Sequence, residues 1–434
     1  MRHHLIKTRR QLFSPKKNKQ RLIFLSSALI VGAVAAFFAI AAQQADHQYL
    51  ALFKSHPWVA LAIPPLSLAL IAWLTKNVFL GTEGSGIPQT IAALEMPSHA
   101  MRKKVLSLKI AFGKILLTIM GLFSGASIGR EGPTVHVGAS IIYSLHTHHG
   151  FKRQHMAKAL IIAGGAAGIS AAFNTPLAGI IFAIEEMSRN FERRLNNILL
   201  LAVILAGLTA IAILGEYTYF GHSNAVLPLN QYAWVAIIIC GIGGGILGGL
   251  FSLTLIHGSK RLFHFARAHP IYLAFICGLL ISLLGYSSNG LTFGTGYHEA
   301  KNLIDGGEAT AGFPFMKLLA TIASYLSGIP GGIFAPSLSI GAGFGANLAE
   351  YFPLLPAASL IILGMVGYFT GVVQTPITAF VIVMEMTTNS SLLLPLMATA
   401  LIAKGFSKLV CPTPIYQALS EVYLANTKEP KTQS

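Results

Sequence analysis

Long apolar segments recur along the chain, and the first, Leu22 to Ala42, has 21 residues without a charge. A helix needs about 20 apolar residues to cross a bilayer. Only 11% of the 434 residues are Asp, Glu, Lys or Arg, against about 25% in a soluble domain. So few charges cannot keep a chain of this length in water. The sequence therefore predicts an all-α polytopic membrane protein.

Several of the later apolar segments are too short to cross a bilayer. We expect helices in the following apolar segments, with boundaries placed to about 2–4 residues: 22–42, 59–80, 105–127, 133–146, 158–173, 176–187, 197–215, 232–258, 271–286, 316–329, 336–350, 358–373, 376–387 and 392–406. Segments 158–173 and 176–187 are separated by Asn174-Thr175-Pro176, which is typical of a helix start. Irregular backbone at membrane depth persists only where it is buried or lines a wet cavity. The broken helices therefore indicate a transport pathway.

Basic residues predict the topology. Residues 1–21 contain eight Lys and Arg and no acid, and further basic loops lie near 102–104, 152–153, 189–194 and 260–261. Such loops are typically cytoplasmic, whereas the loop at 216–231 has no Lys or Arg and is expected outside. The net charge of +16 thus reports topology, and we expect no nucleic-acid partner.

An internal repeat divides the membrane region. The segment from Thr175-Pro176 to Glu185 recurs 200 residues later, from Thr375-Pro376 to Glu385. A chance match is the alternative, but the shared Glu favours a repeat. Since the halves enter the membrane from opposite sides, the repeat is inverted, which places substrate between half-helix ends at the midplane. We expect a basic cytoplasmic segment at 1–21, membrane halves at 22–216 and 217–418, and a short cytoplasmic tail at 419–434.

Glycine and proline interrupt the apolar pattern at Gly84–Pro88, Gly129–Pro133, Gly332–Pro336 and, later, Pro414-Ile415-Tyr416. In the first three, glycine exposes backbone N–H groups and proline begins the next helix. A helix N-terminus attracts an anion through free N–H groups and the dipole. Tight turns between helices are the alternative interpretation. That interpretation would be preferred for a single motif, but three such motifs in one apolar chain favour an anion site.

In these motifs and their order, the chain resembles the CLC family of chloride channels and chloride/proton exchangers over about residues 20–418. The resemblance implies a CLC-type inverted repeat of broken and tilted helices and a homodimer with one pathway per subunit. It further implies that Ser85, Tyr416 and backbone groups of Ile333 and Phe334 bind the anion. Two carboxylates complete the implied site: Glu131 as outer gate and proton acceptor, and Glu186 for internal proton transfer.

Other interpretations of these residues exist. Glu131 could pair with Arg130, although consecutive residues do not face each other on a helix. Ser85 could be a helix N-cap, and Tyr416 could lie at the membrane interface. Glu185 shares its repeat position with Glu385, which predicts a structural role and leaves Glu186 as the proton carrier.

The preferred function is voltage- and pH-sensitive chloride transport by chloride/proton antiport, and the alternative is a passive chloride channel of the same fold. The expected partners are chloride, protons, lipid and a second copy of the chain. We expect no enzyme activity, no catalytic residues, no cofactor and no metal, and His146, His148 and His149 are interpreted as a solvated cluster. A fluoride-selective relative is disfavoured by Ser85 and Pro133. The absence of an appended regulatory domain favours a bacterial inner membrane with both termini cytoplasmic.

Overall fold

The computed structural model describes residues 15–147, 151, 154–187, 196–215, 218–308 and 310–427. Within these ranges the chain is helical, with isolated bridges but no strand. Seven of the described helices are long and apolar enough to cross a membrane: Asn18–Ser55, Pro57–Asn77, His99–Phe123, Met156–Phe173, Gln231–Ala268, Pro270–Ser287 and Ser390–Val410. Shorter apolar helices lie between them, as the broken pattern of the sequence predicts.

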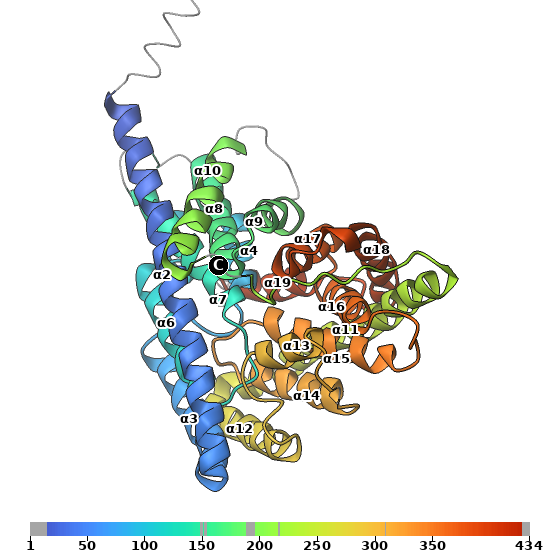
Figure 1. Cartoon of the computed structure of the whole chain (residues 1–434). Helices are drawn as coiled ribbons and strands as arrows, with labels where there is room; N and C mark the ends of the chain where they lie inside the picture. The colour runs from blue at the N-terminus through green and yellow to red at the C-terminus, as the bar shows by residue number, and fades with distance from the viewer. Residues whose placement is uncertain are drawn as a thin grey trace, which may run out of the picture.

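Two similar series of helices lie side by side (Figure 1). The first comprises α2 (Pro15–Ser55), α3 (Pro57–Asn77), α4 (Ile87–Glu95), α5 (His99–Val105), α6 (Leu108–Phe123), α7 (Glu131–Tyr143), α8 (Gln154–Phe173), α9 (Pro176–Phe182) and α10 (Asn196–Leu214). The second comprises α11 (Gln231–Ala268), α12 (Pro270–Ser287), α13 (Tyr297–Ile304), α14 (Phe313–Leu326), α15 (Phe334–Ala349), α16 (Ala357–Val373), α17 (Pro376–Thr387) and α18 (Leu393–Val410). Helix α19 (Ile415–Thr427) follows.

The break predicted at Asn174-Thr175-Pro176 separates α8 from α9, and the corresponding break separates α16 from α17. Asn174 and Gln374 both have left-handed backbone conformations, with φ of 58° and 59°. A single left-handed residue ends a helix, and the proline two residues later begins the next one at its first position. The same local code therefore acts in both halves.

The two short helices that follow these breaks are capped reciprocally. Glu185 accepts hydrogen bonds from the backbone N–H groups of Ile377 (3.3 Å) and Thr378 (2.7 Å). Glu385 accepts the equivalent bonds from Leu177 (3.2 Å) and Ala178 (2.7 Å). Each half thus supplies a carboxylate to the helix start of the other, where free N–H groups attract negative charge. The structural role predicted for this pair of glutamates is confirmed.

A buried lysine supports one loop in each half. Lys114 Nζ donates hydrogen bonds to the carbonyl oxygens of Glu83 (3.1 Å) and Gly84 (2.9 Å). Lys317 Nζ donates to three carbonyls, those of Thr292 (2.9 Å), Phe293 (3.1 Å) and Gly294 (2.9 Å). Both ammonium groups satisfy backbone acceptors that no helix satisfies, which is how irregular backbone persists in an apolar interior.

Close helix packing also recurs in the two halves. A Cβ on Gly138 of α7 would lie 2.3 Å from the Gly164 carbonyl oxygen of α8, and a Cβ on Gly341 of α15 would lie 2.7 Å from that of Gly364 in α16. Backbones approach this closely only where both helices present glycine. The pairs α7–α8 and α15–α16 therefore form two similar, closely packed units. Helices α7 and α15 begin within two of the three segments Gly84–Pro88, Gly129–Pro133 and Gly332–Pro336, which we call the Gly-Pro motifs.

Two expected boundaries fall inside helices. Helix α2 runs through the boundary expected at 21/22, because the basic residues before it are good helix formers and continue the apolar helix without a break. Helix α19 runs through the boundary at 418/419, where Ala418 and Leu419 are buried. The boundary at 216/217 lies outside the described residues.

Candidate functional site

The three Gly-Pro motifs meet at the centre of the molecule through backbone hydrogen bonds. Gly129 and Gly332 each donate to the other's carbonyl oxygen at 2.7 Å. The Gly84 N–H donates to the Ile329 carbonyl (3.2 Å), and the Gly331 N–H donates to the Gly84 carbonyl (3.1 Å). The starts of α4, α7 and α15 are thus held together, as the prediction of an anion site requires.

Glu131 lies in this junction as the first residue of α7 and is fully buried. Its Oε1 accepts a hydrogen bond from the Tyr219 hydroxyl at 3.2 Å. The carboxylate also interacts with the backbone N–H of Ala335 at the start of α15. It therefore lies where two positive helix ends converge, a place that favours negative charge. The neighbouring Arg130 guanidinium lies over the Tyr219 ring, 5.8 Å from its centroid.

Ser85 and Tyr416 are also buried in the junction. The two hydroxyls lie near each other, but neither makes a hydrogen bond of good geometry with the protein. The Ser85 Oγ packs against Gly132, and the Tyr416 hydroxyl is close enough to Ser85 and Glu131 to interact electrostatically with both. Because α19 packs against α4, the two hydroxyls come from opposite ends of the chain to one place.

The alternative roles for these two residues are wrong. The N-cap of α4 is Gly86, and no side chain caps that helix, so Ser85 is not an N-cap. Tyr416 is completely buried, which excludes a membrane-interface position for its hydroxyl. Two buried hydroxyls without partners are costly, and their lone pairs and protons are free to interact with a polar ligand.

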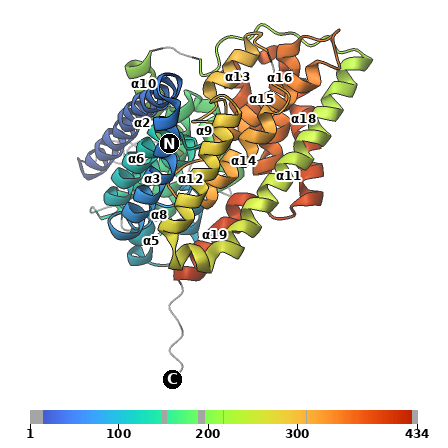
Figure 2. The ribbon, with the colours of Figure 1, turned by 90° about the horizontal axis from the view of Figure 1, so that it is seen from below.

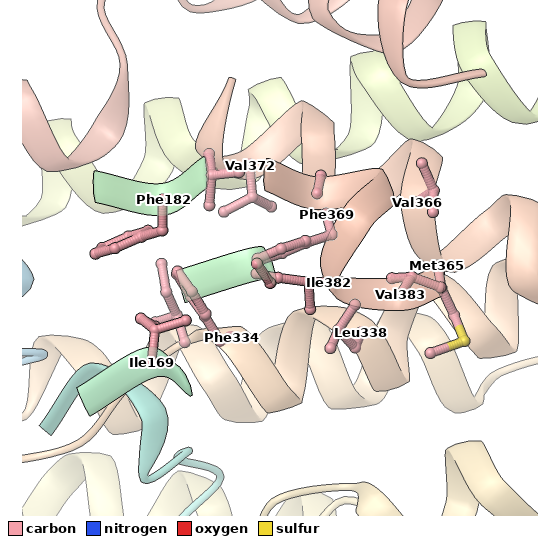
Figure 3. Packing of buried hydrophobic residues seen from close by; sticks show 14 of the residues in the cluster. Ile169, Phe182, Phe334, Leu338, Met365, Val366, Phe369, Val372, Ile382 and Val383 are labelled. Atoms are coloured by element: carbon pink, nitrogen blue, oxygen red, sulfur yellow. The ribbon is translucent and has the colours of Figure 1, made fainter. Parts of the chain in front are cut away.

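Ile333 and Phe334 start α15 and are 1% and 2% exposed. The Phe334 ring contacts those of Phe369, at 4.8 Å between centroids, and Tyr416, at 5.8 Å. Figure 3 shows Phe334 among buried apolar side chains of both halves, including Phe182. This apolar wall lowers the local dielectric constant, which strengthens electrostatic interactions in the junction.

Glu186 lies in a π-helical turn, Ala183–Met187, that continues α9. Its side chain is half-buried and is close enough to Tyr416 to interact electrostatically with the tyrosine hydroxyl. Wide turns of this kind inside helices are frequent at functional sites. Tyr416 thus interacts with both predicted proton-carrying glutamates. The basic loop after Glu186 lies outside the described residues.

Tyr219 is a site residue that sequence reasoning missed. It belongs to a short non-helical segment after α10, and its ring packs edge-on against those of Phe220 (5.0 Å) and Tyr297 (5.1 Å). No motif surrounds it, so only the tertiary fold identifies it as the donor to Glu131. Its loop was expected outside because it lacks Lys and Arg.

The predicted solvated histidine cluster needs correction. His146 is 9% exposed and stacks on His99, with 5.0 Å between ring centroids, and on Tyr143, at 5.4 Å. The loop folds back onto α5, so this imidazole packs against other rings. His148 and His149 lie outside the described residues. No group of three or more His, Cys, Asp or Glu that could hold a metal ion occurs in the described part of the chain.

Comparisons with known proteins agree with this arrangement. A family model described as "Voltage gated chloride channel" matches residues 67–408. The chain is 30% identical over 443 residues to the "H(+)/Cl(-) exchange transporter ClcA" of Yersinia pestis bv. Antiqua (strain Angola), covering 95% of this chain and 90% of the relative. The protein of the same name from Yersinia pseudotuberculosis serotype O:3 (strain YPIII) matches equally well.

Solved structures are similar over almost the whole chain. One is a slow cyanobacterial Cl−/H+ antiporter, with a TM-score of 0.81, 27% identity, and coverage of 94% of this chain and 98% of that one. Another, a CLC-type fluoride/proton antiporter, has a TM-score of 0.78 at 24% identity, covering 92% and 96%. At this sequence identity, the similarity to the fluoride/proton antiporter shows a common fold and nothing about the transported ion. The predicted all-α polytopic membrane fold with an inverted repeat is confirmed.

Proposed function

Because this chain belongs to the voltage-gated chloride channel family, we propose that it exchanges chloride for protons across a membrane. The observation that carries the proposal is the position of Glu131, whose carboxylate lies between the starts of α7 and α15. An anion and an ionised carboxylate compete for the same helix ends. Since the charge of Glu131 depends on its protonation, anion occupancy and proton occupancy become coupled.

The exchange follows from this competition. When Glu131 takes up a proton it loses its attraction to the helix N-termini, and its side chain can move aside. Chloride then occupies the junction and accepts hydrogen bonds from the Ser85 and Tyr416 hydroxyls and from backbone N–H groups at Ile333 and Phe334. When Glu131 releases the proton, its carboxylate returns and displaces the anion. Tyr219 holds the returned carboxylate through its hydroxyl.

Protons need a second route, because the anion occupies the first. Glu186 supports such a route: it is half-buried and interacts with Tyr416, which in turn interacts with Glu131. We assign Glu186 the internal transfer of protons. A passive chloride channel uses the same anion site without this step. The relatives named above as exchange transporters favour antiport.

The wider arrangement is part of the same proposal. Every proposed site residue belongs to one chain, so each subunit of a homodimer has its own pathway. Leucine and isoleucine side chains are exposed on α10 and α18, and either lipid or a second copy can cover them: Leu200, Leu201, Ile204, Leu208, Leu394, Leu401 and Leu409. We place the first half at α2–α10 and the inverted half from α11 onward. We infer from the positive-inside rule that both termini are cytoplasmic, and we propose a bacterial inner membrane as the location.

Flux measurements in liposomes test the function. The purified protein is reconstituted with a chloride gradient, and a potassium ionophore clamps the voltage while chloride and proton movements are recorded together. We expect chloride flowing down its gradient to drive protons in the opposite direction, uphill. Chloride flux without proton flux at all pH values would replace antiport with the channel. If the reconstituted protein transported fluoride faster than chloride, fluoride would replace chloride as the proposed substrate.

A further inference from the structure

An apolar groove lies away from the anion site, on the outer surface between α2, α6 and α7. Its volume is about 600 Å³. The lining is almost wholly apolar, with Ile30 and Val34 on α2, Phe112 on α6 and Ile141 on α7. Helices α2 and α6 lie side by side in both views (Figures 1 and 2). The groove plays no part in the proposed exchange.

The groove has the length of one lipid leaflet. Its lining extends along α2 from Leu22 to Val34, about 18 Å at a rise of 1.5 Å per residue. Half of a bilayer's hydrocarbon core is about 15 Å. Leu22 and Phe112 are 64% and 61% exposed, so the groove opens outward to the lipid. An acyl chain therefore fits it in length and in chemistry.

Within the described part of the chain, the charged residues that flank one end of the groove are basic. Arg21 precedes the lining residue Leu22, Lys19 lies one helical turn before Ile23, and Lys109 follows the lining residue Leu108. All three cationic side chains are exposed. No acidic residue occurs between residues 1 and 45 or between 96 and 130. The end of the groove thus carries uncompensated positive charge at the depth where a bound lipid places its headgroup.

We propose that this groove binds one anionic phospholipid, with an acyl chain between α2, α6 and α7 and its phosphate-containing headgroup at Lys19, Arg21 and Lys109. Clustered Lys and Arg next to a membrane helix attract anionic lipid, and the apolar groove selects against a free phosphate. Exposed Ser26 lies in the lining near the basic end. A larger side chain at this position would obstruct the acyl chain without disturbing the core.

Lipid retention in native mass spectrometry tests the proposal. The detergent-purified protein is titrated with phosphatidylglycerol and, separately, with phosphatidylcholine of identical acyl chains. We expect one retained phosphatidylglycerol per subunit at about tenfold lower concentration than phosphatidylcholine. The K19Q/R21Q/K109Q variant should lose this preference, and S26F should weaken the binding of both lipids.

A matched control removes similar charges elsewhere. Lys260, Arg261 and Arg267 are exposed on α11, far along the chain from the groove, and K260Q/R261Q/R267Q should keep the preference for phosphatidylglycerol. Gel filtration and chloride flux show whether each variant is folded. Equal retention of the two lipids by wild type, or unchanged retention in K19Q/R21Q/K109Q, would overturn the proposal. If the wild-type protein had the mass of two chains and S26F had the mass of one, the groove would instead be the binding site of a second copy.

Discussion

At the scale of single residues, the site depends on groups whose polar atoms lack partners. The hydroxyls of Ser85 and Tyr416 are buried without hydrogen bonds, which costs free energy unless a ligand accepts those bonds. Glu131 contrasts with them, because Tyr219 already donates to it. This contrast supports the proposal that two anions exchange at the site, chloride and the Glu131 carboxylate.

Replacing Glu131 with Gln tests the exchangeable carboxylate. Glutamine keeps the shape but cannot ionise, so it cannot compete with chloride in a pH-dependent way. We expect E131Q to conduct chloride while proton flux falls to background, and chloride flux should lose most of its pH dependence. Paired chloride and proton recordings in liposomes measure both quantities. Retained uphill proton pumping by E131Q would remove Glu131 from the mechanism.

The hydroxyl pair makes a separate prediction. A hydrogen bond to a charged group contributes about 1.5–3 kcal/mol, so Y416F and S85A should each weaken chloride binding by about tenfold or more. Calorimetric titration with chloride is the measurement. S359A is a suitable control, because Ser359 is buried with an unpartnered hydroxyl but lies on α16. Wild-type affinity in a folded Y416F/S85A double variant would contradict both assignments.

Tyr219 shows why part of the site could not be predicted. The residues in Gly-Pro motifs carried a local signal, since glycine and proline mark helix starts wherever they occur. Tyr219 has no such signal: its neighbours are ordinary loop residues, and its hydroxyl reaches Glu131 only through tertiary packing 88 residues away along the chain. Y219F removes the donor that holds the ionised Glu131 carboxylate. Chloride should then displace the carboxylate more easily, so chloride flux should persist and depend less on pH, which a pH titration of flux measures.

At the scale of elements, the adjacent glutamates Glu185 and Glu186 have different surroundings, and we propose that only Glu186 takes part in transport. Glu185 caps the start of α17 with three hydrogen bonds, whereas Glu186 interacts with Tyr416. The repeat predicted this division, because only Glu185 has a counterpart, Glu385, at the same position in the other half. Their reciprocal bonds could not be derived from the sequence, since spacing does not show which helices meet.

Paired substitutions test this division. E186Q should abolish proton movement while chloride still permeates. E185Q and E385Q should retain coupled flux but lower thermal stability, because a lost helix cap costs about 0.5–2 kcal/mol. Flux assays and thermal unfolding followed by fluorescence measure the two effects. The assignments would be reversed if E185Q stopped proton flux and E186Q did not.

The loop at Gly84 makes the remaining prediction at this scale. Lys114 donates to two loop carbonyls, which also accept hydrogen bonds from the Gln89 side chain and the Gly331 N–H. K114M would therefore remove one charge-assisted hydrogen bond from each carbonyl, at about 1.5–3 kcal/mol each. We expect lower stability together with weaker chloride binding, because the loop carries Ser85. K103M is the control, since Lys103 is exposed on the neighbouring helix α5 and belongs to neither proposed site. Equal effects of the two variants would show that the buried ammonium has no special role.

At the scale of the whole molecule, the sequence predicted the fold because the bilayer permits few solutions. Apolar length, breaks at Asn174 and Gln374, and the 200-residue repeat are enough to predict two inverted halves of broken helices. Helix ends at membrane depth were less predictable: α2 and α19 run through expected boundaries. The first boundary was placed where the charged residues end and the second where the resemblance to the family ends, but a helix does not stop where it leaves the lipid.

The last prediction concerns the proposed homodimer. Ser85, Glu131, Ile333, Phe334 and Tyr416 come together within one chain, so no site residue is contributed by a partner. A mixed dimer of wild type and E131Q, isolated with two different affinity tags, should therefore carry one coupled and one uncoupled pathway. Its proton-to-chloride ratio should be intermediate, and both homodimers in the same assay set the limits. Full coupling or none in the mixed dimer would mean that the two pathways act together, which a site built within a single chain does not explain.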